Sequence, residues 1–138
     1  MKIIYQNPEG GVSVVHPTGE VPIEELPAKL GLVDYEIVED DVISSDRTFR
    51  NAWVKSGATV VEDLVKSKEI SHDRRRAARA KEFKPHDEVI AKQIPGEDAT
   101  AAEAARAAVR TKYETVQNDI DAATDTATLK AILLEVEA

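Results

Sequence analysis

Short apolar runs alternate with turn residues in the N-terminal third of the chain. Residues 1–5 (Met-Lys-Ile-Ile-Tyr) and 12–16 (Val-Ser-Val-Val-His) are rich in β-branched and aromatic side chains, and the segment between them, from Asn7 to Gly11, contains one proline and two glycines. Two β-prone runs joined by a short Pro/Gly turn predict a β-hairpin.

The next stretch switches to helical spacing and then back to alternation. Its apolar residues are interrupted by Pro27 and closed by Gly31, which predicts short helical turns. After them, Val33, Tyr35 and Ile37 alternate with acidic residues, a pattern that predicts a half-buried strand with these three on the buried face. Three short strands with one helical crossover make a marginal sheet, so we expect another segment to pack on it.

Helix-forming residues dominate from Thr59 onward, apart from Pro85 and Pro95-Gly96. Residues 59–62 (Thr-Val-Val-Glu) have a capping-box pattern that predicts a helix running to about Lys81, and residues 100–103 (Thr-Ala-Ala-Glu) predict a second helix start. Apolar residues in the first of these helices gather at positions 61–65. We therefore expect its first two turns to be buried and its basic half to be exposed or held by a partner.

Two apolar stripes near the C-terminus predict that the last helices associate. The first stripe precedes Asp125, a residue typical of helix N-caps, and the second follows it. The stripes are Ala105, Val109, Tyr113, Val116, Ile120 and Ala123, and then Leu129, Ile132, Leu133 and Val136. A short connection favours an antiparallel helical hairpin, although the same stripes could pair with a second copy in a homo-oligomer.

Together these patterns predict an α+β protein in two parts. Residues 1–57 form a small β-rich head, with a hairpin and one further strand, which ends in the segment Arg-Thr-Phe-Arg-Asn-Ala-Trp (47–53). Residues 58–138 form a helical extension that contains the helical hairpin.

Charge and composition narrow the classes of partner. The formal net charge is −8 and the isoelectric point is about 4.9, a balance that disfavours nucleic-acid and membrane binding. No apolar run approaches a membrane span and the first apolar run is too short for a signal peptide, so we expect a chain that is cytosolic when made. Zero cysteines exclude disulfides, thiol catalysis and thiolate metal sites.

The segment from Arg47 to Trp53 is the first candidate for a partner contact. It gathers the one Trp and one of two Phe in a chain with few large aromatics, and Arg47 and Arg50 flank them. Phe49 and Trp53 are four residues apart, which suggests a helical turn starting near residue 45 or 46. Two alternatives stay open: burial against the small sheet, or an exposed anchor for a partner.

The basic run at residues 74–81 is the second candidate. On a helix its side chains spread around most of the circumference, so a solvated face or pairing with acidic neighbours of the same chain is the simpler interpretation. A contact between Arg75 or Arg79 and a partner protein is the alternative. Nucleic acid is disfavoured because no aromatics interleave with the arginines.

No group of side chains in the sequence matches a metal-binding or catalytic motif. His86-Asp87-Glu88 cannot converge on one ion from consecutive positions, and residues 39–41 (Glu-Asp-Asp) lack the alternation and glycine of a calcium loop. Ser44, Ser45 and His72 belong to no nucleophile-elbow or phosphate-loop motif. We therefore expect no catalytic residue, no metal, no cofactor and no enzymatic activity.

Three segments resemble small proteins encoded in the tail modules of tailed bacteriophages: residues 1–12 (Met-Lys-Ile-Ile-Tyr-Gln-Asn-Pro-Glu-Gly-Gly-Val), 45–53 (Ser-Asp-Arg-Thr-Phe-Arg-Asn-Ala-Trp) and 68–79 (Lys-Glu-Ile-Ser-His-Asp-Arg-Arg-Arg-Ala-Ala-Arg). The helical end, from Ala105 through Tyr113 to Ile120, is similar to the C-terminal helices of phage tail-assembly and tail-fibre assembly chaperones.

The resemblance implies a virion structural protein of the tail tip, baseplate or fibre attachment, without catalytic residues, that contacts other tail proteins. It equally implies an alternative, an assembly chaperone that leaves before the virion is complete. Either protein is made in the cytoplasm of the bacterial host, and the first would end in the virion tail.

Overall fold

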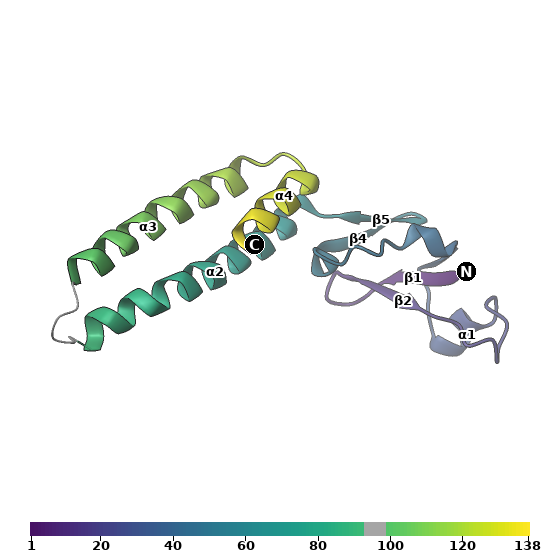
Figure 1. Ribbon diagram of the computed structural model, residues 1–138. Helices are drawn as coiled ribbons and strands as arrows, with labels where there is room; N and C mark the ends of the chain where they lie inside the picture. Colours follow the sequence, from purple (N-terminus) through teal and green to yellow (C-terminus); the bar gives the residue numbers. More distant parts are fainter. Residues whose placement is uncertain (93–98) are drawn as a thin grey trace. The chain divides into compact units, whose positions relative to one another are not determined.

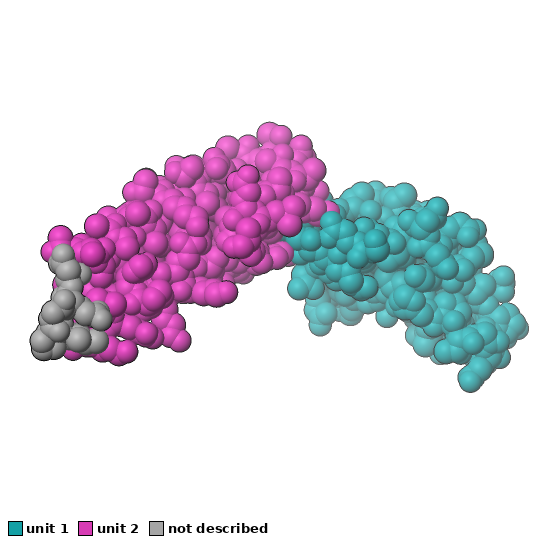
Figure 2. All heavy atoms as spheres, viewed as in Figure 1, with its two compact units in different colours: residues 1–67 teal, residues 68–138 magenta. Residues whose placement is uncertain are grey.

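The computed structural model describes residues 1–92 and 99–138 and has an α+β fold. The chain divides into two compact units, residues 1–67 and 68–138 (Figure 2). Within residues 1–92 and 99–138, no helix combines the length and the apolar composition required to span a membrane.

A three-stranded antiparallel sheet forms the first unit's N-terminal half. Its strands are β1 (Lys2–Gln6), β2 (Val12–Val15) and β3 (Tyr35–Val38), in the order β2-β1-β3, so β2 and β3 are the edges. Figure 1 labels β1 and β2, which lie side by side. Ile4 lies opposite Val14 on one side and Glu36 on the other. The predicted hairpin and third strand are confirmed.

The turn between β1 and β2 follows from its residues. The Asn7 N–H donates to the Gly11 carbonyl at 2.8 Å, and the Gly10 N–H donates back to the Asn7 carbonyl at 3.0 Å. Gly10 has φ +90°, as the glycine of a three-residue hairpin loop with a bulge requires. The Asn7 side chain accepts the Glu9 and Gly11 N–H groups, which stabilises the loop.

The predicted crossover is a short helix, α1 (Leu26–Leu30), which ends at Gly31 with φ +68°. The burial predicted for the following strand holds for one of its three residues. Ile37 is half-buried, but Tyr35 is 36% exposed and Val33, which lies before β3, is 96% exposed. Val38, on the other face, is buried. Val38 is buried because it lies on the same sheet face as Ile4, where Trp53 packs.

The cover of that face is a second hairpin. A one-turn 3₁₀ helix (Asp40–Val42) and another (Arg50–Ala52) lead into β4 (Trp53–Ser56), which pairs with β5 (Thr59–Glu62) across a turn where Gly57 has φ +57°. Trp53 packs with Ile4, Val12 and Val38. The helical turn predicted to carry Trp53 is wrong, because Trp53 is the first residue of a strand.

The predicted helix start at Thr59 is also wrong. Residues 59–62 pair with β4 and belong to the first unit, so the boundary predicted after residue 57 falls in a hairpin turn. The helix α2 (Leu64–Lys92) begins after Asp63, whose side chain accepts the Lys66 N–H at 2.8 Å as an N-cap does. It continues past Lys81 and contains Pro85.

The helical unit consists of the rest of α2 with α3 (Ala99–Ala122) and α4 (Thr126–Val136), and α2 and α3 run side by side (Figure 1). Thr100 lies within α3, and the break predicted at Pro95-Gly96 lies outside the described residues. Asp125 caps α4 as predicted, since its side chain accepts the Thr128 N–H at 2.7 Å. That hydrogen bond lowers the pKa of Asp125.

Candidate functional site

The aromatic junction is part of the core of the first unit. Phe49 is 0% and Trp53 1% exposed, so the exposed-anchor alternative is wrong and burial against the sheet is confirmed. The guanidinium carbons of Arg50 and Arg47 lie 4.5 and 5.8 Å from the centroid of the Trp53 ring. Both arginines thereby act on a ring of their own chain, and a cation over an aromatic face is stabilising.

Arg50 also binds one edge of the sheet. Its Nη2 donates a 2.7 Å hydrogen bond to the carbonyl of Val12, on the edge strand β2. Burial, together with the charge of Arg47, lowers the pKa of Arg50. An arginine stays charged well above neutral pH, so this hydrogen bond is charge-assisted.

The basic run of α2 pairs inside the helical unit. Arg75, predicted as a partner contact, is buried and donates to Gln117 at 3.0 Å, so it offers no surface. The guanidinium carbon of Arg79 lies 4.7 Å from the centroid of the Phe83 ring. Burial is the main cause that lowers the pKa of Arg75. The charges of Arg76 and Arg79 lower it further. Arg74 is paired bidentately with Glu137, and Arg76 is paired with Asp73. Arg74, Arg75 and Arg76 thus pair within the chain, whereas Arg79 is exposed and a contact between it and a partner stays a prediction.

Polar side chains join α2 to α3 along their length, and we call this set the polar ladder. Its members come from successive turns of the two antiparallel helices. They are Lys68 Nζ with the Asp121 carbonyl (2.9 Å), His72 Nε2 with Asp121 (2.8 Å), Arg75 with Gln117, Glu82 with Lys112 (2.6 Å) and Tyr113 (2.5 Å), and Asp87 with Arg106 (3.0 Å).

Glu82 is the most strongly held member of the ladder. Hydrogen bonds from Lys112 and Tyr113 lower the pKa of its carboxyl group. Burial, followed by the bond to Glu82, raises the pKa of Tyr113 well above its usual value of 10. Tyr113 therefore stays protonated at neutral pH and serves as a hydrogen-bond donor, not as a base.

The predicted helix-association residues form the core of the helical unit. Phe83, Val109, Tyr113 and Val136 pack together, with Val116 and Ile132 partly buried against them. Ile120, Leu129 and Leu133 are each at most 3% exposed. The stripes thus meet within one chain, and α2 supplies a third face that the sequence did not reveal.

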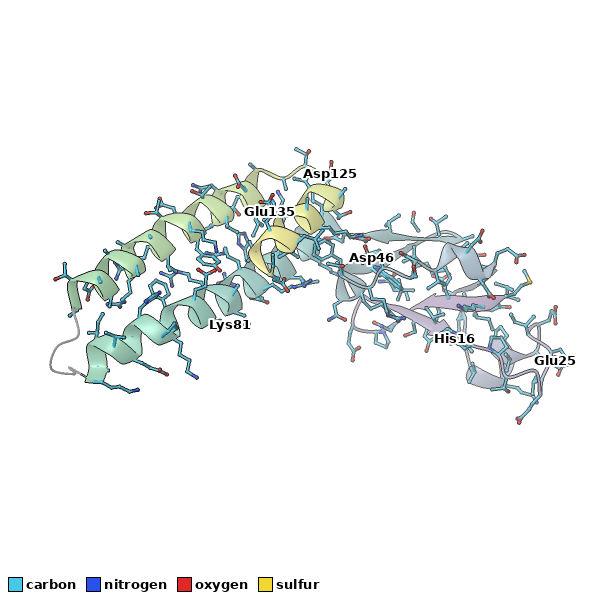
Figure 3. The ribbon with its side chains drawn as sticks, in the orientation of Figure 1. His16, Glu25, Asp46, Lys81, Asp125 and Glu135 are labelled. Carbon is cyan, nitrogen blue, oxygen red and sulfur yellow. The ribbon has the colours of Figure 1, made fainter. Side chains whose placement is uncertain are left out.

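A cleft of about 490 Å³ opens beside this core. It is lined by Arg74, Ala77, Ala78, Lys81 and Glu82 of α2, by Tyr113, and by Val136, Glu137 and Ala138. Arg74 is bound by Glu137 and Glu82 by Tyr113 and Lys112, whereas the exposed Lys81, labelled in Figure 3, has no partner in the part of the chain that the structure describes. Most of the charged side chains that line the cleft are thus engaged in pairs within the helical unit.

The other constellations considered from sequence stay apart. Among residues 1–92 and 99–138, no three His, Cys, Asp or Glu side chains are placed to hold a metal ion. His72 pairs with Asp121 through Nε2, but its buried Nδ1 has no hydrogen-bond partner. A serine-based hydrolase needs a hydroxyl at that nitrogen, so His72 and Asp121 have the geometry of a structural pair.

Sequence reasoning missed one surface of the first unit. Leu30, Val33 and Tyr35 are 52%, 96% and 36% exposed, and they lie within six consecutive residues that run from the end of α1 to the first residue of the edge strand β3. The signal was present in the sequence as an alternation of apolar residues, but it was assigned to the buried face. Apolar side chains gathered on a surface mark interaction sites more often than isolated ones do.

Comparison with known proteins gives no relative: no protein-family model, no curated protein and no solved structure matches the chain.

Proposed function

We propose that the chain is a non-enzymatic structural protein of a bacteriophage tail, at the tail tip, baseplate or fibre attachment, which acts through contacts with other tail proteins. The observation that carries the contact role is the exposed apolar group Leu30, Val33 and Tyr35 beside an open sheet edge. The tail context comes from the resemblance of residues 1–12, 45–53 and 68–79 to tail-module proteins.

The placement of the titratable side chains supports a contact role over catalysis. Glu82, His72 and Arg74 are each tied to a partner within the helical unit. A catalytic group needs a free lone pair or proton next to the space where a substrate sits. Groups consumed by structural pairs are better suited to holding a scaffold rigid.

Mass spectrometry of purified virions, from a phage that encodes the chain, tests this proposal. A retained tail component should appear in a fixed ratio to the other tail proteins, across independent preparations. Absence from virions, with abundance in infected cells, would contradict the structural role. If the chain then co-purified with a tail protein from those cells, the assembly-chaperone alternative would take its place.

Enzymatic activity would contradict both alternatives. The purified chain should release no fragments from bacterial peptidoglycan, with lysozyme as the positive control and a heat-unfolded sample as the blank. Release that depends on the folded chain would refute the proposal.

A further inference from the structure

We propose that the open edge of β3 is a docking site for a lysine- or arginine-bearing extended segment of a partner protein, which adds to the sheet as a fourth strand. This inference rests on the proposed function, that the chain acts through protein contacts. It names the surface, the backbone geometry and the chemistry of the partner.

The direction of the peptide groups on β3 follows from the hairpin. The Asn7 N–H bonds the Gly11 carbonyl, so the bonded positions of β1 toward β2 are Asn7, Tyr5 and Ile3. Alternate residues of a strand point their peptide groups to opposite sides, so Ile4 and Lys2 bond β3. Their partners there are Glu36 and Val38.

The remaining peptide groups of β3, those of Tyr35 and Ile37, therefore point away from β1. Sheet order places no strand on that side, and no hydrogen bond reaches these groups from elsewhere in residues 1–92 and 99–138. On the opposite edge, Arg50 binds one outward group, the Val12 carbonyl of β2. An uncovered edge offers a ladder of donors and acceptors to an added strand.

Side chains along the open edge define the two faces of the added strand. Tyr35 lies directly opposite Tyr5, so two aromatic side chains are neighbours on one face. Glu36 points to the other face because successive side chains alternate. A strand that alternates apolar and basic residues would pair with both faces at once.

The charge of the edge selects a basic partner. Residues 34–41 contain five carboxylates and no cation. Asp34 pairs with Lys55 and Asp40 with the N-terminal amine, but Glu36, Glu39 and Asp41 have no partner in the described residues. A basic segment would be attracted to this edge, and its docking would weaken as salt increases.

A second copy of the chain fits the same edge poorly. Pairing β3 with β3 would bring two sets of unpaired carboxylates together, and like charges placed opposite each other across a ladder are destabilising. The charged edge thereby resists self-pairing while remaining open to an oppositely charged strand.

Nuclear magnetic resonance titration with synthetic peptides tests the docking site directly. The probe is a short, end-blocked peptide in which valine and lysine alternate. Two matched probes carry glutamate in place of lysine, or N-methyl groups on alternate amides that block strand pairing. We expect the lysine peptide to shift the amide signals of residues 33–38, and each matched probe to bind at least about tenfold more weakly.

Variants of the protein provide the second arm. Tyr35→Pro removes one outward N–H while leaving the β1 ladder bonds in place, as an edge strand tolerates. The triple variant Glu36→Lys, Glu39→Lys, Asp41→Lys reverses the net charge of residues 34–41. Both should lose at least about tenfold in affinity for the lysine peptide. The matched control changes the charge equally at three exposed sites elsewhere in the first unit, Glu9→Lys, Glu20→Lys and Glu24→Lys, and should bind within about twofold of the parent.

Equal binding of the lysine, glutamate and N-methylated peptides to the unaltered protein would overturn the inference, and this comparison does not depend on the variants folding. Shifts confined to residues outside 30–41 would also overturn it. Self-association by light scattering that Tyr35→Pro abolishes would make a second copy the occupant instead. Any of these results, together with the chain in purified virions, would leave the proposed function standing without this docking site.

Discussion

Replacing Trp53 by alanine should unfold the first unit and leave the helical unit folded. The Trp53 side chain is 1% exposed and packs with Ile4, Val12 and Val38, residues of three different strands. Burial of a large aromatic removes about 150–250 Å² from water, and at about 25 cal/mol per Å² this contributes about 4–6 kcal/mol. Measured truncations of buried aromatics to alanine cost about 3–5 kcal/mol.

This cost is comparable to the total stability of the unit. A unit of residues 1–67 has a free energy of unfolding of about 3–10 kcal/mol at the usual stability per residue. The core of the helical unit, in contrast, is formed by Phe83, Val109, Tyr113 and Val136 and contains no residue of the first unit. The effect of Trp53→Ala should therefore be confined to residues 1–62.

Hydrogen exchange followed by mass spectrometry separates the two units. In Trp53→Ala, peptides from residues 1–62 should exchange at close to the unfolded rate, while peptides from residues 99–138 keep their protection. Tyr35→Ala is the matched control, because it also removes an aromatic ring from the first unit but at a position 36% exposed. It should lose about 1 kcal/mol or less. Protection in β1 to β4 that is the same in Trp53→Ala and the parent would refute the assignment of Trp53 to the core.

Three further substitutions test the helical unit. The double variant Val116→Asp, Leu133→Asp should lose most of its helical circular dichroism, because it places carboxylates against the packed stripes. The control Leu134→Asp, at a position 75% exposed, should match the parent. Equal spectra for the two variants would contradict the packing. Glu82→Gln should reduce the fall in melting temperature that acid causes. The lowered pKa of Glu82 stabilises the fold above the ordinary value of 4.5, and this stabilisation is lost as pH falls through the lowered value. The same slope of melting temperature against pH in parent and variant, between pH 7 and pH 3, would exclude this contribution of Glu82. Asp125→Ala should cost about 1 kcal/mol in chemical denaturation through loss of the α4 N-cap, and an unchanged midpoint would show that the cap contributes nothing.

Local signals explain why the first sheet could be predicted from sequence. The β1–β2 hairpin is closed by Asn7 and Gly10, residues whose own side chain or backbone freedom specifies the loop. The end of α1 at Gly31 and the cap of α4 at Asp125 are equally local. Such features depend on neighbouring residues only, so they can be inferred without knowing what packs on them.

The second hairpin could not be predicted in the same way. Thr59 and Glu62 have the spacing of a capping box, yet Thr-Val-Val is also a run of β-branched residues after a turn glycine. Both structures are locally acceptable. Residues 59–62 form a strand because they pair with β4, whose Trp53 is buried on the first sheet. This pairing partner cannot be inferred from the local sequence.

The buried face of α2 was missed because it is not apolar. Ser67, Ser71 and Arg75 recur every four residues and are all buried, and Phe83 is buried farther along the helix. A search for apolar periodicity passes over such a stripe, since small and charged residues usually mark a solvated face. Apolar periodicity also misled the prediction at β3, where apolar residues that alternate with acidic ones are partly exposed.

The polar ladder makes the α2–α3 packing sensitive to sliding. Apolar stripes of similar side chains tolerate a shift of one helix along the other, but a shift of one turn, about 5.4 Å, would separate Glu82 from the tyrosine hydroxyl and bring it to the level of Val109, four residues earlier in α3. The buried Arg75 would lose Gln117 in the same movement. Each displaced group would have to give up its partner before another was available. The two helices therefore have one preferred alignment along their length, the one in which Glu82 and Arg75 both keep their partners.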